Sequence, residues 1–176
     1  MNTKPKSGFE IVPAQIFDSY GIAKIQVEAW RVAYRGIVPD SILDSLSVEE
    51  KSEIWKEKIK DAIVKHLVCK VSDEIVGYTN YGDPQFDKNS KDYTQEIWGL
   101  YVAPKHFRQG FGTILMNEAE SKIAESEYKR IVLHCFQKND SSMKFYRKNG
   151  YRLTGKSLPH PRFNEQLLVE YEKRIN

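Results

Sequence analysis

Cysteine is scarce in this sequence, which contains only Cys69 and Cys135, each inside an apolar run. Two cysteines at this spacing exclude a disulfide framework and a zinc knuckle, so we expect two buried free thiols. Reduced thiols favour a cytoplasmic location. No apolar run is long enough to span a membrane, and residues 1–8 are polar and lack an apolar signal core. We therefore expect a flexible tail over residues 1–8, a single domain over residues 9–176, and no membrane partner.

A large excess of one charge is also missing. The chain has 27 basic and 24 acidic residues, a formal net charge of +3, which argues against a nucleic-acid partner and is compatible with a small anionic ligand. The histidines are scattered, and no His-x-x-x-His or Cys-x-x-Cys pattern occurs, so we expect no metal site. A Gly-x-Ser-x-Gly nucleophile motif is absent as well.

The pattern of apolar residues predicts a mixed order of strands and helices, typical of an α+β (mixed α/β) domain. Apolar and β-branched runs predict strands over Phe9–Val12, His66–Val71, Ile75–Tyr81, Gln95–Val102, Arg130–Phe136, Tyr151–Leu153 and Gln166–Tyr171. Helical spacing and capping residues predict helices from Asp18 or Ser19 to about Tyr34, from Pro39 to Leu46, from Ser47 to about Ala62, over Gly110–Glu125, and over Asp140–Lys148 with Asp140 as its cap.

The chemistry of the chain is concentrated where the strand ending at Val102 leads into a helix that opens with Gly110-Phe111-Gly112. The N-terminus of a helix has unpaired N–H groups and a partial positive charge, so it attracts phosphate. Glycine lets the backbone approach an anion closely, and Arg108 adds a positive charge. The pattern fits neither a Walker loop nor a dinucleotide-binding loop, which needs a third glycine where Leu115 stands.

Three blocks of this sequence occur in the order typical of a known family. The blocks are Trp30 with Tyr34–Asp40, Ile97–Pro104 with Gly110-Phe111-Gly112, and Leu133–Cys135 with Asn139 and Phe145–Tyr151. The chain from about Phe9 to Glu172 thereby resembles the bacterial members of the GNAT superfamily of N-acetyltransferases, most strongly from Glu96 to Tyr151. The resemblance implies the N-acyltransferase fold of that family, a central, mostly antiparallel, strongly twisted sheet flanked by helices.

The resemblance also implies acetyl-CoA as the acyl donor and a place for it. The strand ending at Val102 and the strand around Leu133 run parallel and splay apart, and the pantetheine arm lies in the opening. The residues implied to bind the cofactor are Leu100, Tyr101, Val102, Arg108, Gln109, Gly110, Phe111, Gly112, Thr113, Asn139 and Tyr146. One position departs from the family pattern, since Phe107 stands where a glutamine or arginine is usual.

Two residues match catalytic positions of the family. Tyr146 matches a tyrosine that protonates the departing CoA thiolate, and a phenol is suited to act as this general acid. Without the resemblance, Tyr146 would be assigned to the core. Glu96 matches a glutamate that takes the proton from the amine, and the alternative is a solvated carboxylate at the strand end. Asn139 either bonds the pantetheine or is a turn residue before the last helix.

Trp30, Arg31, Tyr34 and Arg35 match the part of the family that builds the acceptor pocket, but some of them must belong to the core, and we expect Trp30 to pack rather than bind. His134 faces away from Leu133 and Cys135, and a lone histidine there is more often structural than catalytic.

The resemblance implies an acetyl-CoA-dependent N-acetyltransferase that acts on a primary amine. Because the sequence offers no convincing nucleophile, we expect direct attack in a ternary complex, without an acyl-enzyme. The acceptor is left open between a small-molecule amine and a peptide, so protein N-terminal or lysine acetylation is one alternative. A non-catalytic CoA-binding regulatory module is the other. Because family members are often dimers, the resemblance further predicts a homodimer.

Overall fold

The computed structural model describes residues 8–61, 63–86 and 93–175, so the tail predicted for residues 1–8 lies almost wholly outside the described chain. The centre of the fold is a seven-stranded sheet in the order β1-β2-β3-β4-β5-β7-β6. The strands are β1 (Phe9–Pro13), β2 (Lys65–Val71), β3 (Glu74–Gly82), β4 (Thr94–Val102), β5 (Arg130–Phe136), β6 (Arg152–His160) and β7 (Phe163–Arg174). In the described chain β4 and β5 pair in parallel, and the other strand pairs are antiparallel. The predicted fold class is therefore confirmed.

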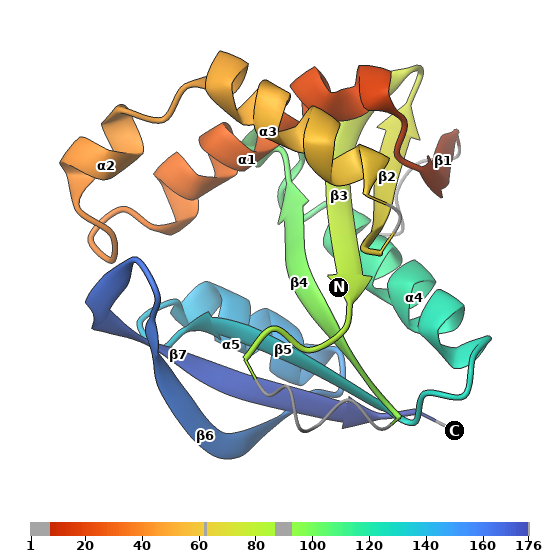
Figure 1. The fold of residues 1–176 in the computed structure, drawn as a ribbon, viewed down its shortest axis with the longest axis vertical. Helices are drawn as coiled ribbons and strands as arrows, with labels where there is room; N and C mark the ends of the chain where they lie inside the picture. The colour runs from red at the N-terminus through yellow and green to blue at the C-terminus, as the bar shows by residue number, and fades with distance from the viewer. Residues whose placement is uncertain (1–7, 62, 87–92, 176) are drawn as a thin grey trace.

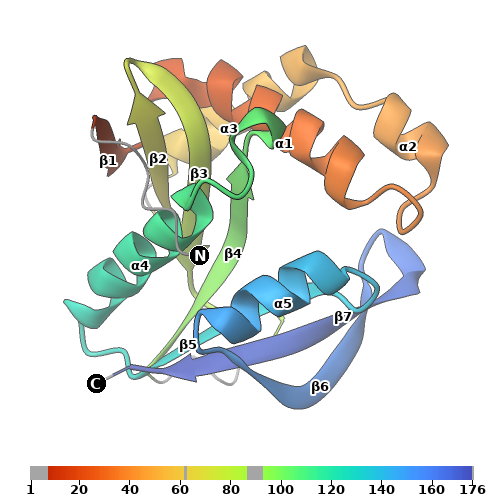
Figure 2. The same ribbon diagram turned by 180° about the vertical axis from the view of Figure 1, so that it is seen from behind.

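Helices cover both faces of the sheet (Figures 1 and 2). They are α1 (Ser19–Ala33), α2 (Asp40–Asp44), α3 (Val48–Lys60), α4 (Phe111–Ala124) and α5 (Asp140–Lys148), with short 3-10 turns at Ile16–Asp18 and Pro104–His106. Helices α1 and α3 lie on one face, over β2 to β4, whereas α4 and α5 lie on the other face. Among the helices of the described chain, none is long and apolar enough to cross a membrane.

Helix α1 packs through the apolar stripe that its sequence predicts. Ile22, Ile25 and Ala29 are buried, and α1 contributes to a core cluster with Trp55 of α3 and Tyr78 of β3. Burying large aliphatic side chains stabilises such a layer by about 1.5–3 kcal/mol each.

The last two strands are longer than predicted. Sequence patterning predicts Tyr151–Leu153 and Gln166–Tyr171, whereas β6 extends to His160 and β7 from Phe163 to Arg174. Strand β6 is an edge strand, and only an edge strand tolerates a proline such as Pro159. Its register also shifts between Leu153 and Ser157, where Gly155 has a φ of 86°. This irregularity interrupts the alternation by which strands are recognised.

Candidate active site

The opening between β4 and β5 is the central feature of the candidate site. The parallel pairing begins at Thr94 with Arg130 and ends at Ile97 with Leu133. Beyond that point β4 remains paired with β3, and β5 remains paired with β7. The two strands diverge in both views of Figures 1 and 2. A bulge lies at this place in β4, since Tyr81 pairs with Ile97 and Asn80 with Gly99, which leaves Trp98 as the extra residue. The predicted splay of two parallel strands is confirmed.

The first turn of α4 lies against both sides of this opening. Gly110 is the N-cap with a φ of 92°, a left-handed conformation that favours glycine. Gly112 lies close to β4 and to α5, the helix that follows β5, because a Cβ there would be 3.4 Å from the Phe145 ring of α5 and 3.7 Å from Leu100 of β4. Arg108 also has a positive φ of 60°, which is costly for a residue with a side chain. The chain therefore enters α4 through two left-handed residues, Arg108 and Gly110, and the first N–H groups of the helix lack helical partners.

Tyr146 of α5 lies among other tyrosines beside the opening. Its ring packs against Tyr151 and Tyr171, and burial, with Cys135 and Tyr101 nearby, raises the pKa of its phenol. On the opposite side, the phenols of Tyr34 and Tyr101 are hydrogen-bonded at 3.0 Å. Burial, then the neighbouring Tyr101, raises the pKa of Tyr34 well above its usual value, so these phenols stay protonated near neutral pH.

Glu96 is not the solvated strand-end carboxylate that the sequence left open as an alternative. Its side chain is only 2% exposed, and both of its oxygens have partners. Oε1 lies 2.9 Å from Nδ1 of His134, and Oε2 accepts the backbone N–H of Gln85 at 2.6 Å. Burial of a carboxylate is costly unless it is compensated in this way.

Two of the residues expected at the acceptor pocket, Arg31 and Arg35, instead bind residues of the segment that follows α1. Arg31 donates to the backbone carbonyls of Leu43, Asp44 and Leu46. Arg35 forms ion pairs with Asp40 and Asp44. Trp30 and Tyr34 remain as candidates, and their rings meet edge to face at 5.2 Å.

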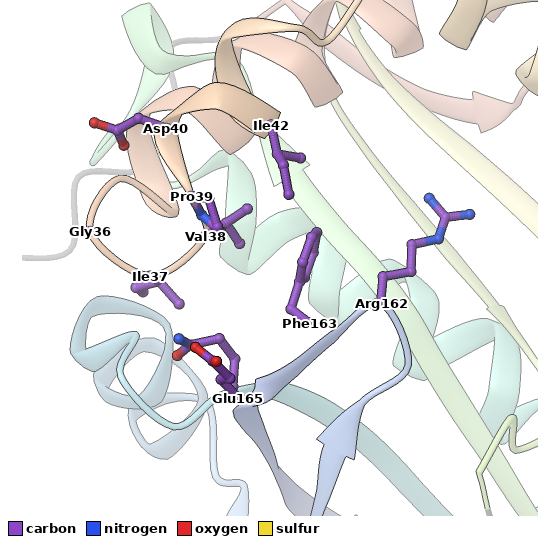
Figure 3. Close-up of a pocket in the computed structure, with 10 residues that line it drawn as sticks. Gly36, Ile37, Val38, Pro39, Asp40, Ile42, Arg162, Phe163 and Glu165 are labelled. Carbon is purple, nitrogen blue, oxygen red and sulfur yellow. The ribbon is translucent and has the colours of Figure 1, made fainter.

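A hollow of about 730 Å³ lies between the α1–α2 loop and the β6–β7 turn. Its walls include the apolar side chains of Val38, Ile42 and Phe163 together with the charged Arg162 and Glu165 (Figure 3). The hollow does not include Glu96 or Tyr146. It therefore lies apart from the two residues that the sequence predicts to be catalytic.

Asn139, rather than the predicted Asp140, caps helix α5. Its side chain is buried and accepts the N–H of Ser142 at 3.1 Å, which satisfies an orphan donor of the first turn. The other alternative for Asn139, a bond to pantetheine, is not tested by this contact.

Sequence reasoning missed the surroundings of His134. The alternation in β5 correctly predicts that His134 faces away from Leu133 and Cys135. It does not show that Glu96 and Glu170, from the two neighbouring strands, face the same ring. Among the described residues, no group of His, Cys, Asp and Glu side chains is arranged to hold a metal ion.

Comparisons with known proteins agree with this architecture. The profile of the acetyltransferase (GNAT) family matches residues 25–151. The uncharacterized N-acetyltransferase YuaI of Bacillus subtilis (strain 168) is 24% identical over 128 residues, which are 73% of this chain and 72% of the relative. The probable N-acetyltransferase Rv2775 of Mycobacterium tuberculosis is 25% identical over 156 residues, covering 86% and 84% of the two chains.

Among solved structures, the PaiA N-acetyltransferase of Thermoplasma acidophilum in complex with coenzyme A has the same fold. It superposes with a TM-score of 0.78 at 20% identity, covering 96% of this chain and 99% of that one. The family profile spans most of the chain, and the splayed sheet agrees with the fold of that family. The chain therefore belongs to the acetyltransferase (GNAT) family and is an N-acetyltransferase.

Proposed function

We propose that this enzyme transfers the acetyl group of acetyl-CoA to a primary amine by direct attack in a ternary complex. The observation that carries the proposal is the first turn of α4, which lies against both Leu100 and Phe145 at the opening between β4 and β5. Its N–H groups and partial positive charge suit a pyrophosphate, and the diverging strands leave backbone edges for the pantetheine amides.

We assign the cofactor residues to the two sides of this opening. The backbones of Leu100, Tyr101 and Val102 receive the pantetheine arm, and the N–H groups from Arg108 to Thr113, including those of Gln109, Gly110, Phe111 and Gly112, receive the pyrophosphate. The side chain of Tyr101 is already bonded to Tyr34, so only its backbone is offered to the cofactor.

In the transfer, the amine nitrogen bonds to the thioester carbon and the carbon–sulfur bond breaks, releasing the CoA thiolate. Tyr146 donates its phenolic proton to that thiolate as a general acid, and the acetylated nitrogen loses its second proton, which restores the phenol. Glu96 accepts the proton that the acceptor ammonium loses before it attacks. In support of direct attack, burial raises the pKa of Cys135 to about 12, and a thiol of this kind is a poor nucleophile.

The first experiment is calorimetric titration with acetyl-CoA of the wild type and of Thr113→Glu. Thr113 lies in the first turn of α4, where a glutamate is compatible with the helix dipole but repels a bound pyrophosphate. One like-charge pair about 4 Å apart costs about 1 to 4 kcal/mol, so we expect affinity to fall from about 5-fold to about 1,000-fold. Thr113→Gln has the same shape without the charge and should bind nearly as the wild type does.

The second experiment measures thiol release from acetyl-CoA with spermidine, an aminoglycoside, free lysine and a short peptide with a free N-terminus. Release with any of these amines supports transfer and identifies the acceptor class. Tight acetyl-CoA binding without release from any amine would instead indicate a non-catalytic CoA-binding module. A folded wild type that does not bind acetyl-CoA would refute the proposal.

A further inference from the structure

A row of buried charged side chains crosses β4, β5 and β7 beside the opening. His134 lies between two carboxylates, with Nδ1 2.9 Å from Glu96 Oε1 and Nε2 3.6 Å from Glu170 Oε2. Arg130 continues the row, 3.3 Å from Glu170 and 2.7 Å from Glu172. The side chains of Glu96, His134 and Glu170 are at most 6% exposed, whereas that of Glu172 is 34% exposed.

The row reaches the point where the sheet opens. The last residue pair between β4 and β5 is Ile97 with Leu133. Glu96 belongs to the pair just before it, with Val132, and His134 is the first residue of β5 beyond it. In the antiparallel ladder His134 is directly opposite Glu170. The three groups therefore share one face of the sheet because of strand register, with no loop rearrangement needed.

The direction of the first hydrogen bond depends on the charge of Glu96. Its Oε2 accepts a backbone N–H, and when Glu96 acts as the base its carboxylate is ionised and can only accept, so Nδ1 of His134 is then the donor to Oε1. Nδ1 is then protonated, and Nε2 faces Glu170. The edge of the Phe86 ring, 4.9 Å from the imidazole between centroids, covers the histidine from the β3–β4 side.

A purely structural explanation accounts poorly for this row. Buried ion pairs are often no more stabilising than apolar residues of the same size, because desolvation offsets their attraction. Clusters of buried titratable groups next to a reaction centre are instead typical of functional sites. A carboxylate also has about four lone-pair sites, so Glu96 can still accept a proton from an amine while both of these bonds remain.

We propose that His134, supported by Glu170, is a positioning residue of the acetyl transfer. Its Nδ1–H donates a hydrogen bond to Glu96 and so holds that carboxylate in place beside the opening, where Glu96 takes one proton from the acceptor ammonium and frees the nitrogen lone pair. The inference rests on the proposed function and deepens it. The charged groups facing the pair are Glu170 and Glu172 of β7 and Arg130 of β5.

The test is the pH profile of kcat/KM for His134→Gln, with acetyl-CoA and the panel amine that gives the highest rate. Glutamine has no titrating charge and does not reproduce the imidazole geometry, so Glu96 loses a donor that favours its ionised form. We expect the acidic limb to move to higher pH by about one unit or more and kcat at pH 7 to fall about 10- to 100-fold. KM for acetyl-CoA should change less than about twofold, because the cofactor loop is untouched.

His66→Gln is the matched control. His66 is also a buried histidine, but it lies against Trp55 and bonds the carbonyl of Lys58, away from the opening. This variant should leave the acidic limb in place. Glu170→Gln is a second, isosteric variant. We expect it to move the acidic limb of the kcat/KM profile in the same direction by a smaller amount, and it tests the proposal if His134→Gln does not fold.

A readout independent of turnover is the nitrogen NMR spectrum of the histidine rings in the wild type. A protonated Nδ1 on His134, with a signal that changes in Glu96→Gln, supports the proposal. A bare Nδ1 overturns it whatever the activity. If the wild type acetylates an amine while His134→Gln and Glu170→Gln keep its profile, only this inference fails; if the wild type does not bind acetyl-CoA, the proposed function fails with it.

Discussion

Replacing Tyr146 with phenylalanine separates a catalytic role from a structural one, because it removes a single oxygen. The ring packs in the main core cluster beside Cys135, Tyr151 and Tyr171, and phenylalanine preserves those ring contacts. No hydrogen bond joins the Tyr146 phenol to any residue that the structure describes. Its removal therefore leaves no orphaned partner, and we expect the free energy of unfolding to change by about 0.5 kcal/mol or less.

The effect on the rate should be far larger. A general acid contributes about 10²- to 10⁴-fold, which is about 3 to 5 kcal/mol of activation free energy. We expect kcat of Tyr146→Phe to fall by that factor, measured as thiol release at saturating acetyl-CoA and amine. Tyr151→Phe is the control, since its phenol bonds Met116 Sδ at 3.4 Å deep in the same cluster, and it should keep kcat while losing about 1 kcal/mol of stability.

The pH dependence of the wild type follows from the same residue. Burial raises the pKa of Tyr146, so its acid form persists to a higher pH than that of a free phenol, whose pKa is about 10. We expect no loss of kcat through Tyr146 below about pH 10. An unchanged kcat in Tyr146→Phe, or a basic limb near neutral pH that this variant abolishes, would refute the reasoning.

Three further predictions concern other parts of the molecule. Asn139→Ala removes the cap of α5 and should lower the free energy of unfolding in urea by about 0.5–2 kcal/mol; no change would contradict the capping role. Tyr34→Phe leaves the buried Tyr101 phenol without this partner, and thermal unfolding should show a loss of about 1 kcal/mol. Burial lowers the pKa of His66, so below about pH 6.5 the unfolded chain binds the proton first and stability falls as the pH falls. Denaturant titrations from pH 7 to 5 should show a shallower fall for His66→Gln, and equal slopes would argue against a buried neutral histidine.

The sequence by itself predicted those features that depend on neighbours along the chain. The strand–loop–helix segment around Gly110 and helix α5 were predicted to within a residue or two, because capping, glycine conformation and helical spacing act over one or two turns. The resemblance of three short blocks then correctly predicted the splay of β4 and β5.

The tertiary structure decided what each predicted face meets. Alternation in β4 and β5 shows which side Glu96 and His134 take, but only the strand order brings Glu170 of β7 to the same imidazole. Likewise, only the structure shows that Arg31 and Arg35 bind residues of α2. Burial and pairing of charged side chains depend on strand register and on groups far away in the chain, and a local pattern carries no information about either.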